Sequence, residues 1–409
     1  MFSDLLKESG IVGLAFARVG SINRNLKMAN ANLTVPELVR ARIRDAGGLL
    51  PWAEVMRLAL YEPGLGYYRR GVRRIGRGGD FFTSVSVGPV FGELLVVFIA
   101  QVWRALGEPA DFVIVEQGAH DGTLAADILR ALQRKHPEVF QSLRYIFIEP
   151  DAFLRDAQSK TLEAFGSRLV HASRWTELSE CSRSSFFICN ELPDAMPVHL
   201  VKREAGGWCE MHVQADPTGE FAFVPAPLSS QRLAEECSRL GDKICEGQII
   251  EINLDMLDWI RTISCSVGLV LDYGLPAPEL FAPERIHGTL RRYDGHQCDD
   301  RVMEELGDCD LTSHVNFTRL AQEAEDAGFA VAEFVEQGRF LTRLGATLLS
   351  DAAFQPTASW LRQFQTLSHP GMMGRSFHAL VFAKSTTGIS TTEQQLAARK
   401  RLSLAANHG

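Results

Sequence analysis

Two acidic side chains, Glu191 and Asp194, lie three residues apart directly after an apolar run at residues 185–190. The run has the length and aromatic content of a buried strand. Ligands of open α/β sheets bind beyond the carboxyl ends of the strands, where such carboxylates can bind a cation through paired hydrogen bonds and accept its proton. The pair therefore predicts a site of acid–base chemistry, with helix capping or a simple turn as the alternative.

A second candidate site is the turn at residues 116–122, which joins an apolar run ending in Glu116 to a helix expected at 123–135. Gly118 and Gly122 bracket this turn, and Ala119 lies inside it. Glycine permits positive φ and close approach of a ligand, and a helix N-terminus presents unpaired N–H groups. The turn predicts a nucleotide-type cofactor site, although two glycines after a strand can also form only a tight turn.

The next apolar run ends in Glu149, followed by Pro150. A carboxylate at the tip of the second strand can accept hydrogen bonds from both ribose hydroxyls of an adenosine group, and the alternative is that Glu149 starts a helix. A fourth run, residues 267–272, again ends in an acid, Asp272. Four strand-like runs separated by helix-like segments predict a doubly wound α/β sheet.

Short motifs occur in a fixed order along the chain, at residues 79–84, 91–93, 116–129, 190–197, 271–274, 288–293, 310–317 and 373–377. This series, from about residue 35 to about 385, resembles the MidA-like methyltransferases, which are related to the mitochondrial arginine methyltransferase of complex I assembly. The resemblance implies a Rossmann-like class I methyltransferase sheet and S-adenosylmethionine as cofactor. It also implies an arginine side chain of a protein, such as a respiratory complex subunit, as the acceptor.

The resemblance assigns roles to individual residues. Glu191 and Asp194 become the catalytic pair that holds the guanidinium and takes its proton, with Asp80, Asp272 and Asp310 as second candidates. The residues expected at the cofactor are Glu116, Gly118, Ala119, Gly122, Glu149, Asn190 and Thr83. Those expected at the substrate are Asp80, Tyr293, His296, Asp310 and His314. The two histidines could instead be structural, Thr83 could form only a turn with its neighbours, and no metal is expected.

The departures from the family pattern lie at the cofactor site. The family turn usually reads Glu-Leu-Gly-Pro-Gly-Arg-Gly, so Gln117, Ala119, His120 and Asp121 all differ, and Val85-Ser86 replaces Pro-Glu. A side chain in place of the central glycine is unfavourable if that position needs positive φ. A non-catalytic assembly factor with a degenerate cofactor site is therefore the alternative. A nicotinamide enzyme is disfavoured because the turn lacks the G-x-G-x-x-G spacing.

Composition limits the partners and the compartment. The chain has 409 residues and a net charge of −8, which argues against a general nucleic-acid-binding surface. Five arginines at 69, 70, 73, 74 and 77 are expected to form a solvated loop face, with contact to an acidic partner or to nucleic acid as the alternative. The longest apolar run, 94–100, is too short to span a membrane.

Eight cysteines without a C-x-x-C pair predict reduced thiols and a cytoplasmic protein. A homodimer is a further expectation.

The chain is expected to divide into a helical cap and a core with an insertion. Residues 1–34 are expected to be a disordered tail, with a transit peptide or a start at Met28 as alternatives. The remaining expected segments are the cap at 35–107, the methyltransferase core at 108–200 and 265–386, an insertion of a hairpin and a helix at 201–264 that shapes a substrate groove, and a tail at 387–409. Within the core, we expect a helix at 315–327 and strands at 329–335 and 379–384.

Overall fold

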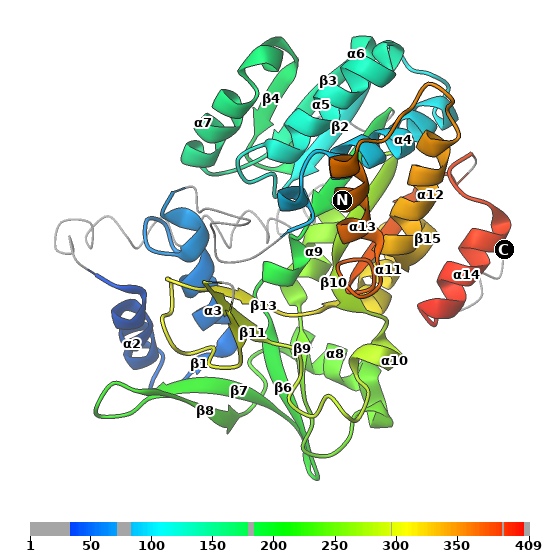
Figure 1. Cartoon of the computed structure of the whole chain (residues 1–409). Helices are drawn as coiled ribbons and strands as arrows, with labels where there is room; N and C mark the ends of the chain where they lie inside the picture. Colours follow the sequence, from blue (N-terminus) through cyan, green and yellow to red (C-terminus); the bar gives the residue numbers. More distant parts are fainter. Residues whose placement is uncertain (1–32, 72–82, 179–183, 296, 387, 405–409) are drawn as a thin grey trace, which may run out of the picture.

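One large twisted sheet is the centre of the molecule (Figure 1). The computed structural model describes residues 33–71, 83–178, 184–295, 297–386 and 388–404. Eight strands form the large sheet in the order β15-β16-β10-β5-β2-β3-β4, with β14 beside β10. Their bounds are β2 Phe112–Gln117, β3 Leu143–Ile148, β4 Leu169–Ala172, β5 Ser185–Asn190, β10 Val267–Leu275, β14 Val315–Asn316, β15 Ala330–Glu336 and β16 Phe377–Ala383.

The strand order reverses beside β2. The chain runs from β2 outward to β3 and β4 and then returns to β5 on the other side of β2, with all of these strands parallel. Strand β10 continues in parallel beyond β5, whereas β16 is antiparallel to both of its neighbours. In such a sheet, a crevice opens beyond the carboxyl ends of the two strands at the reversal. Here those ends are the turn after β2 and the acids after β5.

Successive residues of the central strands face opposite layers of helices, as the two-residue repeat of a strand requires. Phe112 and Ile114 pack with one layer, and Val113 and Val115 pack with the other. The first layer contains α4 Val90–Ala105, α5 Thr123–Lys135, α12 Gln337–Leu349 and α13 Ala358–Ser368. The second contains α8 Gln231–Leu240, α9 Leu254–Thr262, α11 Phe317–Asp326 and α14 Thr392–Arg401. Helices α6 Pro137–Ser142 and α7 Ala152–Thr161 flank β3.

A second sheet and two N-terminal helices form a smaller body below the large sheet (Figure 1). Its strands follow the order β1-β7-β6-β9, and β8 pairs with β7. The elements of this body are α2 Val35–Asp45, β1 Leu50–Pro51, α3 Trp52–Tyr61, β6 His199–Glu204, β7 Gly207–Ala215, β8 Phe221–Ala226 and β9 Ile249–Ile252. A three-stranded sheet of β11 Arg291–Asp294, β12 Gln297–Asp299 and β13 Asp310–Thr312 lies next to it, and α10 spans Ala277–Leu280.

Most expected elements are present, with two corrections. The helix at 123–135 has its expected bounds, whereas the helix expected at 315–327 begins at Phe317 because the two preceding residues pair with β10. The range 35–107, expected as one cap, divides between two layers, since α4 packs on α5 and α12 of the large sheet. The segment 201–264 contains the expected hairpin, formed by β7 and β8, and the expected helix, α8, and it also contributes most of β6 and all of β9 to the same sheet.

Gln117, one of the departures from the family pattern, ties the second helical layer to the end of β2. Its side-chain oxygen accepts hydrogen bonds from the indole N–H groups of Trp175 (3.1 Å) and Trp259 (3.0 Å). Both tryptophans are buried. An indole N–H can only donate a hydrogen bond, so an apolar side chain in place of Gln117 would leave both N–H groups without an acceptor.

We expect Gln117→Leu, which introduces the residue common in the family, to destabilise this chain by about 2 kcal/mol, because two buried donors lose their acceptor. The free energy of unfolding in urea measures the effect. Gln355→Leu, the same change at an exposed position, should stay within about 0.5 kcal/mol of the natural protein. Equal effects of the two substitutions would contradict this account of Gln117.

Candidate active site

The turn after β2 adopts left-handed backbone conformations that favour glycine. Gly118 has φ +79° and Gly122 has φ +83°. A Cβ atom on Gly118 would lie 3.3 Å from the side chain of Leu192, and one on Gly122 would lie 3.1 Å from that of Leu162. Both positions therefore need glycine for conformation and for space. Between them, Ala119 is buried, and the turn leads directly into the N-terminus of α5.

His120 occupies the position of the central family glycine with φ +47°. The position thus needs positive φ, which costs a non-glycine residue roughly 1–2 kcal/mol. Its carbonyl oxygen accepts a hydrogen bond from the side chain of Gln158 (3.0 Å), which fixes the strained peptide. Its Nε2 atom is buried without a hydrogen-bond partner among the described residues. Histidine is therefore accommodated here, with its backbone in the conformation that the family glycine would supply.

Asp121, another departure, prepares the first turn of α5. Its Oδ1 atom accepts hydrogen bonds from the backbone N–H of Thr123 (3.0 Å) and from the Thr123 hydroxyl (2.8 Å). Burial favours the neutral acid, but hydrogen bonds from His120 and Thr123 outweigh it and lower the pKa of Asp121 to about 2. Asp121 therefore stays ionised and accepts a hydrogen bond from one of the first backbone N–H groups of the helix.

Glu116 and Glu149 end neighbouring strands and are both buried. The Tyr145 hydroxyl donates to Glu116 at 2.6 Å, and the backbone N–H of Asp151 donates to Glu149 at 2.9 Å. Burial raises the pKa of each glutamate to about 7, against the effect of these hydrogen bonds. Glu149 does not cap α7, since Asp151 does so by accepting from the backbone N–H of Phe153 (2.8 Å). Helix capping therefore does not explain Glu149.

Glu191 directly follows β5, at the strand reversal, and has φ +53°. Its Oε1 atom accepts from the Asn190 side chain (2.8 Å) and from the backbone N–H of Ser84 (3.2 Å). Burial raises the pKa of Glu191 to about 7, with a further contribution from the nearby carboxylate of Asp310. Asn190 Oδ1 is buried and has no partner among the described residues. The Asn190 side chain therefore keeps an unpaired hydrogen-bond acceptor at the end of β5.

The turn that carries Asp194 is held by other side chains. Asp272 Oδ2 accepts from the backbone N–H groups of Leu192 and Asp194, both at 3.2 Å. The Asn253 side chain donates to the carbonyl oxygens of Pro193 (3.2 Å) and Met196 (3.3 Å). Neither Glu191 nor Asp194 uses its carboxylate to cap a helix here. Helix capping therefore does not explain either carboxylate.

Asp194 has little compensation for its burial among the described residues, namely a backbone hydrogen bond from Ala195. Its side chain is buried, and its Oδ1 atom has no hydrogen-bond partner there. Burial raises the pKa of Asp194 well above its usual range, and the neighbouring carboxylates of Asp272, Glu191 and Asp310 raise it further. Several carboxyl groups this close cannot all be ionised unless a cation joins them.

Tyrosines surround these acids, and the sequence analysis missed three of them. The Tyr68 hydroxyl donates to Asp310 Oδ1 (2.8 Å), and the Tyr61 hydroxyl donates to the Ala195 carbonyl oxygen (3.0 Å). The rings of Tyr61 and Tyr68 stack with centroids 5.7 Å apart. The third, Tyr273, follows Asp272 directly. Adjacent tyrosines in one motif and tyrosine after an acid in another were the signals that could have identified them.

The charge of Asp194 acts on four of the chain's six tyrosines. Burial raises the pKa of each, and the Asp194 carboxylate contributes in the same direction at Tyr61, Tyr68, Tyr273 and Tyr293. Tyr293 lies on the middle strand of the small sheet and pairs with Asp310 in register. The expected substrate residues Tyr293 and Asp310 are therefore brought to the acids of β5.

Other expected site residues have mixed outcomes. Thr83 is buried and exchanges hydrogen bonds with Ser86, whose backbone N–H donates to Thr83 Oγ1 (3.1 Å). Thr83 therefore forms the turn that was the alternative to a role at the cofactor. The next residue, Ser84, is the one that contacts Glu191. Burial, with Arg285 and Arg291 nearby, lowers the pKa of His314 to about 4, so its ring is neutral at pH 7. The expected residues Asp80 and His296 lie outside the described residues.

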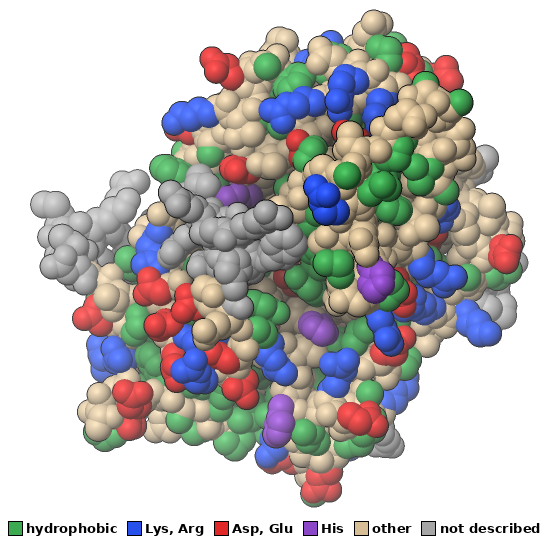
Figure 2. Space-filling model, in the orientation of Figure 1, with side chains coloured by type: hydrophobic (Ala, Val, Ile, Leu, Met, Phe, Trp, Pro, Cys, Tyr) green, Lys and Arg blue, Asp and Glu red, His purple; other side chains and the backbone are tan. Residues whose placement is uncertain are grey.

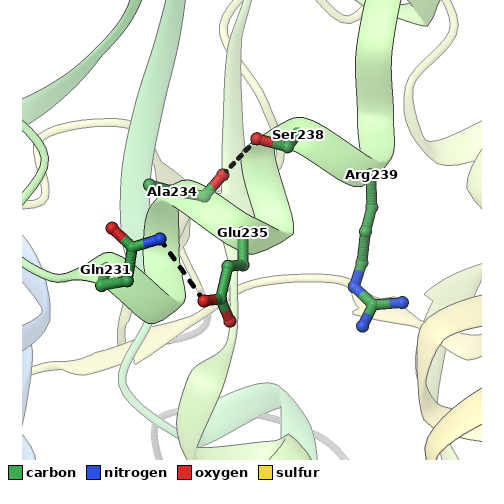
Figure 3. Close-up of a pocket in the computed structure, with 5 residues that line it drawn as sticks. All are labelled: Gln231, Ala234, Glu235, Ser238 and Arg239. Atoms are coloured by element: carbon green, nitrogen blue, oxygen red, sulfur yellow. Dashed lines mark hydrogen bonds between the residues drawn. The ribbon is translucent and has the colours of Figure 1, made fainter.

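Other surface features do not compete with this crevice. A depression of about 440 Å³ is lined by Gln231, Ala234, Glu235, Ser238 and Arg239, all on the outer face of α8 (Figure 3). Acidic and basic side chains are interspersed over the face shown in Figure 2. Within the described ranges, no group of three or more histidine, cysteine or acidic side chains is arranged to hold a metal ion.

Comparisons with known proteins agree on one chemistry. A family model of S-adenosyl-L-methionine-dependent methyltransferases matches residues 94–335, more than half of the chain. The Mus musculus protein named "Protein arginine methyltransferase NDUFAF7, mitochondrial" is 30% identical over 86% of this chain and 85% of its own length. Its Danio rerio counterpart is 29% identical over 87% and 88%. The crystal structure of a Burkholderia thailandensis protein bound to S-adenosyl-homocysteine has a TM-score of 0.76, 29% identity, and coverage of 89% and 94%.

The comparisons also correct one expectation. Curated relatives from several animals are mitochondrial by name, which contradicts the cytoplasmic location expected from the cysteine pattern. Reduced thiols do not distinguish these two compartments. Among the helices that the structure describes, none combines the length and the apolar character needed to cross a membrane.

The raised pKa of Glu149 leads to a pH-dependent cofactor affinity. On the expectation that ribose hydroxyls donate to the ionised carboxylate, binding below pH 7 must first displace a proton. We expect S-adenosylhomocysteine to bind about tenfold more weakly at pH 6 than at pH 8, as measured by calorimetry. Glu149→Gln should bind weakly at pH 8 and show less pH dependence, the remainder coming from Glu116. Equal affinity of the natural protein at both pH values would contradict the assignment.

His120→Gly tests whether the departure at the cofactor turn matters. Because His120 already adopts positive φ, we expect the variant to bind S-adenosylmethionine within about threefold of the natural protein, with about 1 kcal/mol of strain relieved. Calorimetric titration of both proteins measures this, with NAD as a non-binding control. If only the glycine variant binds S-adenosylmethionine, His120 obstructs the site and the assembly-factor alternative gains.

Proposed function

The chain belongs to the family of S-adenosyl-L-methionine-dependent methyltransferases, and from this premise we propose that it methylates an arginine side chain of a partner protein. The relatives named as protein arginine methyltransferases cover most of its length and support this acceptor. A respiratory complex subunit is the partner that the family resemblance favours. The observation that carries the proposal is the set of buried acids and tyrosines at the end of β5.

The cofactor supplies a methyl group already activated on a sulfonium. The residues we propose to hold it are Glu116, Gly118, Ala119, Gly122, Glu149, Asn190 and Thr83. The turn leads into the N-terminus of α5, whose N–H groups suit a polar ligand, and the unpartnered Asn190 Oδ1 atom suits a ligand that brings N–H donors. Glu149 accepts ribose hydroxyls when it is ionised. The burial of Glu116, Glu149 and Asp194 limits the access of water to these groups.

The acids after β5 fit an arginine acceptor. A guanidinium is protonated at neutral pH and has five N–H donors, so it needs carboxylates that bind it and take a proton. Glu191 and Asp194 provide them, and Asp310, fixed by Tyr68, provides a third. Aromatic rings beside a cation add further stabilisation. The entering positive charge lets Asp194 ionise, which offsets part of the cost of burying these acids together.

Transfer needs one proton to leave the acceptor. A new N–C bond forms on the guanidinium as the S–C bond breaks, and an N–H proton passes to a carboxylate. We assign this role to Glu191, because its pKa of about 7 lies near the working pH, where a general base is most effective. Asp194 then balances the positive charge that remains on the methylated guanidinium. The product is again a cation and leaves through the same crevice.

The smaller body suits a protein substrate. We propose that α2 and α3 form a cap over the acceptor pocket and that the sheet containing β6 and β7 forms one wall of a substrate groove. In support, Tyr61 at the end of α3 bonds to Ala195 in the turn that carries Asp194, and β6 begins a few residues later. A long acceptor chain can then lie across the body while one arginine enters the pocket.

Glu191→Gln and Asp194→Asn should each reduce methyl transfer at least about 100-fold, because a positioned base and its charge partner are lost. The affinity for S-adenosylhomocysteine should change less than about threefold. Glu191→Gln should also raise the free energy of unfolding at pH 8, since a carboxyl whose folded pKa is raised to about 7 destabilises the folded state as pH rises through that value.

Methyl transfer from labelled S-adenosylmethionine to an arginine-containing protein extract measures the first effect, and urea unfolding measures the second. Glu284→Gln and Asp300→Asn, the same changes at exposed positions, are the controls and should match the natural protein. Unchanged transfer in both site variants would contradict the proposed base. Cofactor binding without transfer by the natural protein would favour the assembly-factor alternative.

A further inference from the structure

A single turn of 3-10 helix, η1 at Tyr67–Arg69, joins the cofactor side of the crevice to the acceptor side. Two adjacent side chains make the connection. Arg69 forms an ion pair with Asp151 at the start of α7 (3.2 Å), and Tyr68 donates to Asp310 on the small sheet (2.8 Å). Asp151 caps α7, whereas Asp310 lies on β13, and the two residues are distant in the sequence. The turn therefore fixes the two sides of the site relative to each other.

On the cofactor side, Arg69 acts on Glu149 through Asp151. Asp151 caps α7 with its carboxylate and donates its backbone N–H to Glu149 Oε1 (2.9 Å). The Arg69–Asp151 pair is largely buried, with side-chain exposures of 20% and 18%. Such a pair is worth more than a surface pair because water screens it less. Moving Arg69 would thus disturb both the cap of α7 and the position of the Glu149 carboxylate.

We propose that Arg69 is a positioning residue for the cofactor: it holds Asp151 and Glu149 in the arrangement that accepts the ribose hydroxyls, and η1 transmits this arrangement to the acceptor pocket through Tyr68. This inference rests on the proposed role of Glu149 in cofactor binding. The Nε atom of Arg69 is buried with no hydrogen-bond partner among the described residues. The guanidinium therefore retains a donor for a ligand beside Glu149.

The charged groups around Glu149 support the positioning role of Arg69 and predict a measurable pH dependence of cofactor binding. The charged groups that act on it are the carboxylate of Asp151, which raises its pKa, and the guanidinium of Arg69, which lowers it, both less than burial does. From the adjoining elements, α7 supplies the neutral amide of Gln158, and His171 of β4 bonds to that amide (3.0 Å). Without Arg69, Glu149 would hold its proton to higher pH, so cofactor binding would weaken most in mildly acidic solution.

The neighbouring Arg70 provides a matched control. It also forms an ion pair, with Asp308 (2.6 Å), but on the acceptor side of η1, and Asp308 is 66% exposed. Arg70→Met removes the same charge one residue away without touching Asp151. Arg69→Met removes the charge and keeps most of the side-chain volume, and Arg69→Lys keeps the charge without the planar fork.

Calorimetric titration of the full chain with S-adenosylhomocysteine at pH 6.5 and pH 8.5 tests the proposal. We expect Arg69→Met to weaken binding at both values, and about fivefold more at pH 6.5, because a lost cationic neighbour raises a carboxyl pKa by about one unit or more. Arg69→Lys should weaken binding with nearly the natural pH dependence. Arg70→Met should stay within about twofold at both values. Thermal unfolding of each variant confirms that the proteins are folded.

Three results would overturn the proposal. The first is an equal loss of affinity at both pH values in Arg69→Met, because a purely structural role would produce that. The second is binding by Arg69→Met that equals binding by Arg70→Met. The third is natural affinity in Glu149→Gln, which would remove the cofactor role on which the inference rests. Loss of binding in Glu149→Gln alone, with Arg69→Met unaffected, would retain the proposed function and reject only the role of Arg69.

Discussion

The carboxyl group of Asp272 organises the acceptor side of the crevice. One of its oxygens accepts the backbone N–H groups of Leu192 and Asp194, and the other accepts that of Tyr273 at 2.7 Å. Three donors to one side chain favour its ionised form. Burial and the Glu191 carboxylate outweigh these donors, so the pKa of Asp272 lies well above its usual range, as does that of Asp194. The position of the turn that carries Asp194 therefore follows from this single side chain.

Burying so many carboxyl groups destabilises the fold, and the sheet supplies the compensation. Native proteins are stable by only about 5–15 kcal/mol, so a few uncompensated acids are a large fraction of that margin. The central strands offset this cost because both of their faces are covered by apolar layers. Strained backbone at His120 and Glu191 lies just beyond those strands. Part of the backbone strain and of the buried charge therefore lies at these strand ends.

Sequence patterns predicted the local features well. The strand before Gly118, the helix after Gly122 and the acids after β5 depend on short-range chemistry, so their placement followed from a few neighbouring residues. The pairing of β1 with β7 could not be predicted, because a two-residue strand has no periodic signal and its partner is distant in the sequence. The same holds for Gln117, whose two tryptophan partners come from separate helical segments. The sequence placed Asp272 only among the second candidates for the catalytic pair, because two of its donors, Leu192 and Asp194, become its neighbours only in the folded chain.

The two halves of the site share one requirement, which is a carboxylate in a poorly hydrated environment. In the roles we propose, Glu149 must be ionised to accept ribose hydroxyls, and Glu191 must be ionised to take a proton from the acceptor. Burial raises the pKa of both to about 7, so each half becomes competent over the same pH range. The chain places cationic or hydrogen-bonding support beside each: Arg69 acts through Asp151 on one side, and Ser84 and Asn190 donate on the other. Cofactor binding and proton removal are therefore set by the same balance between burial and a few local donors.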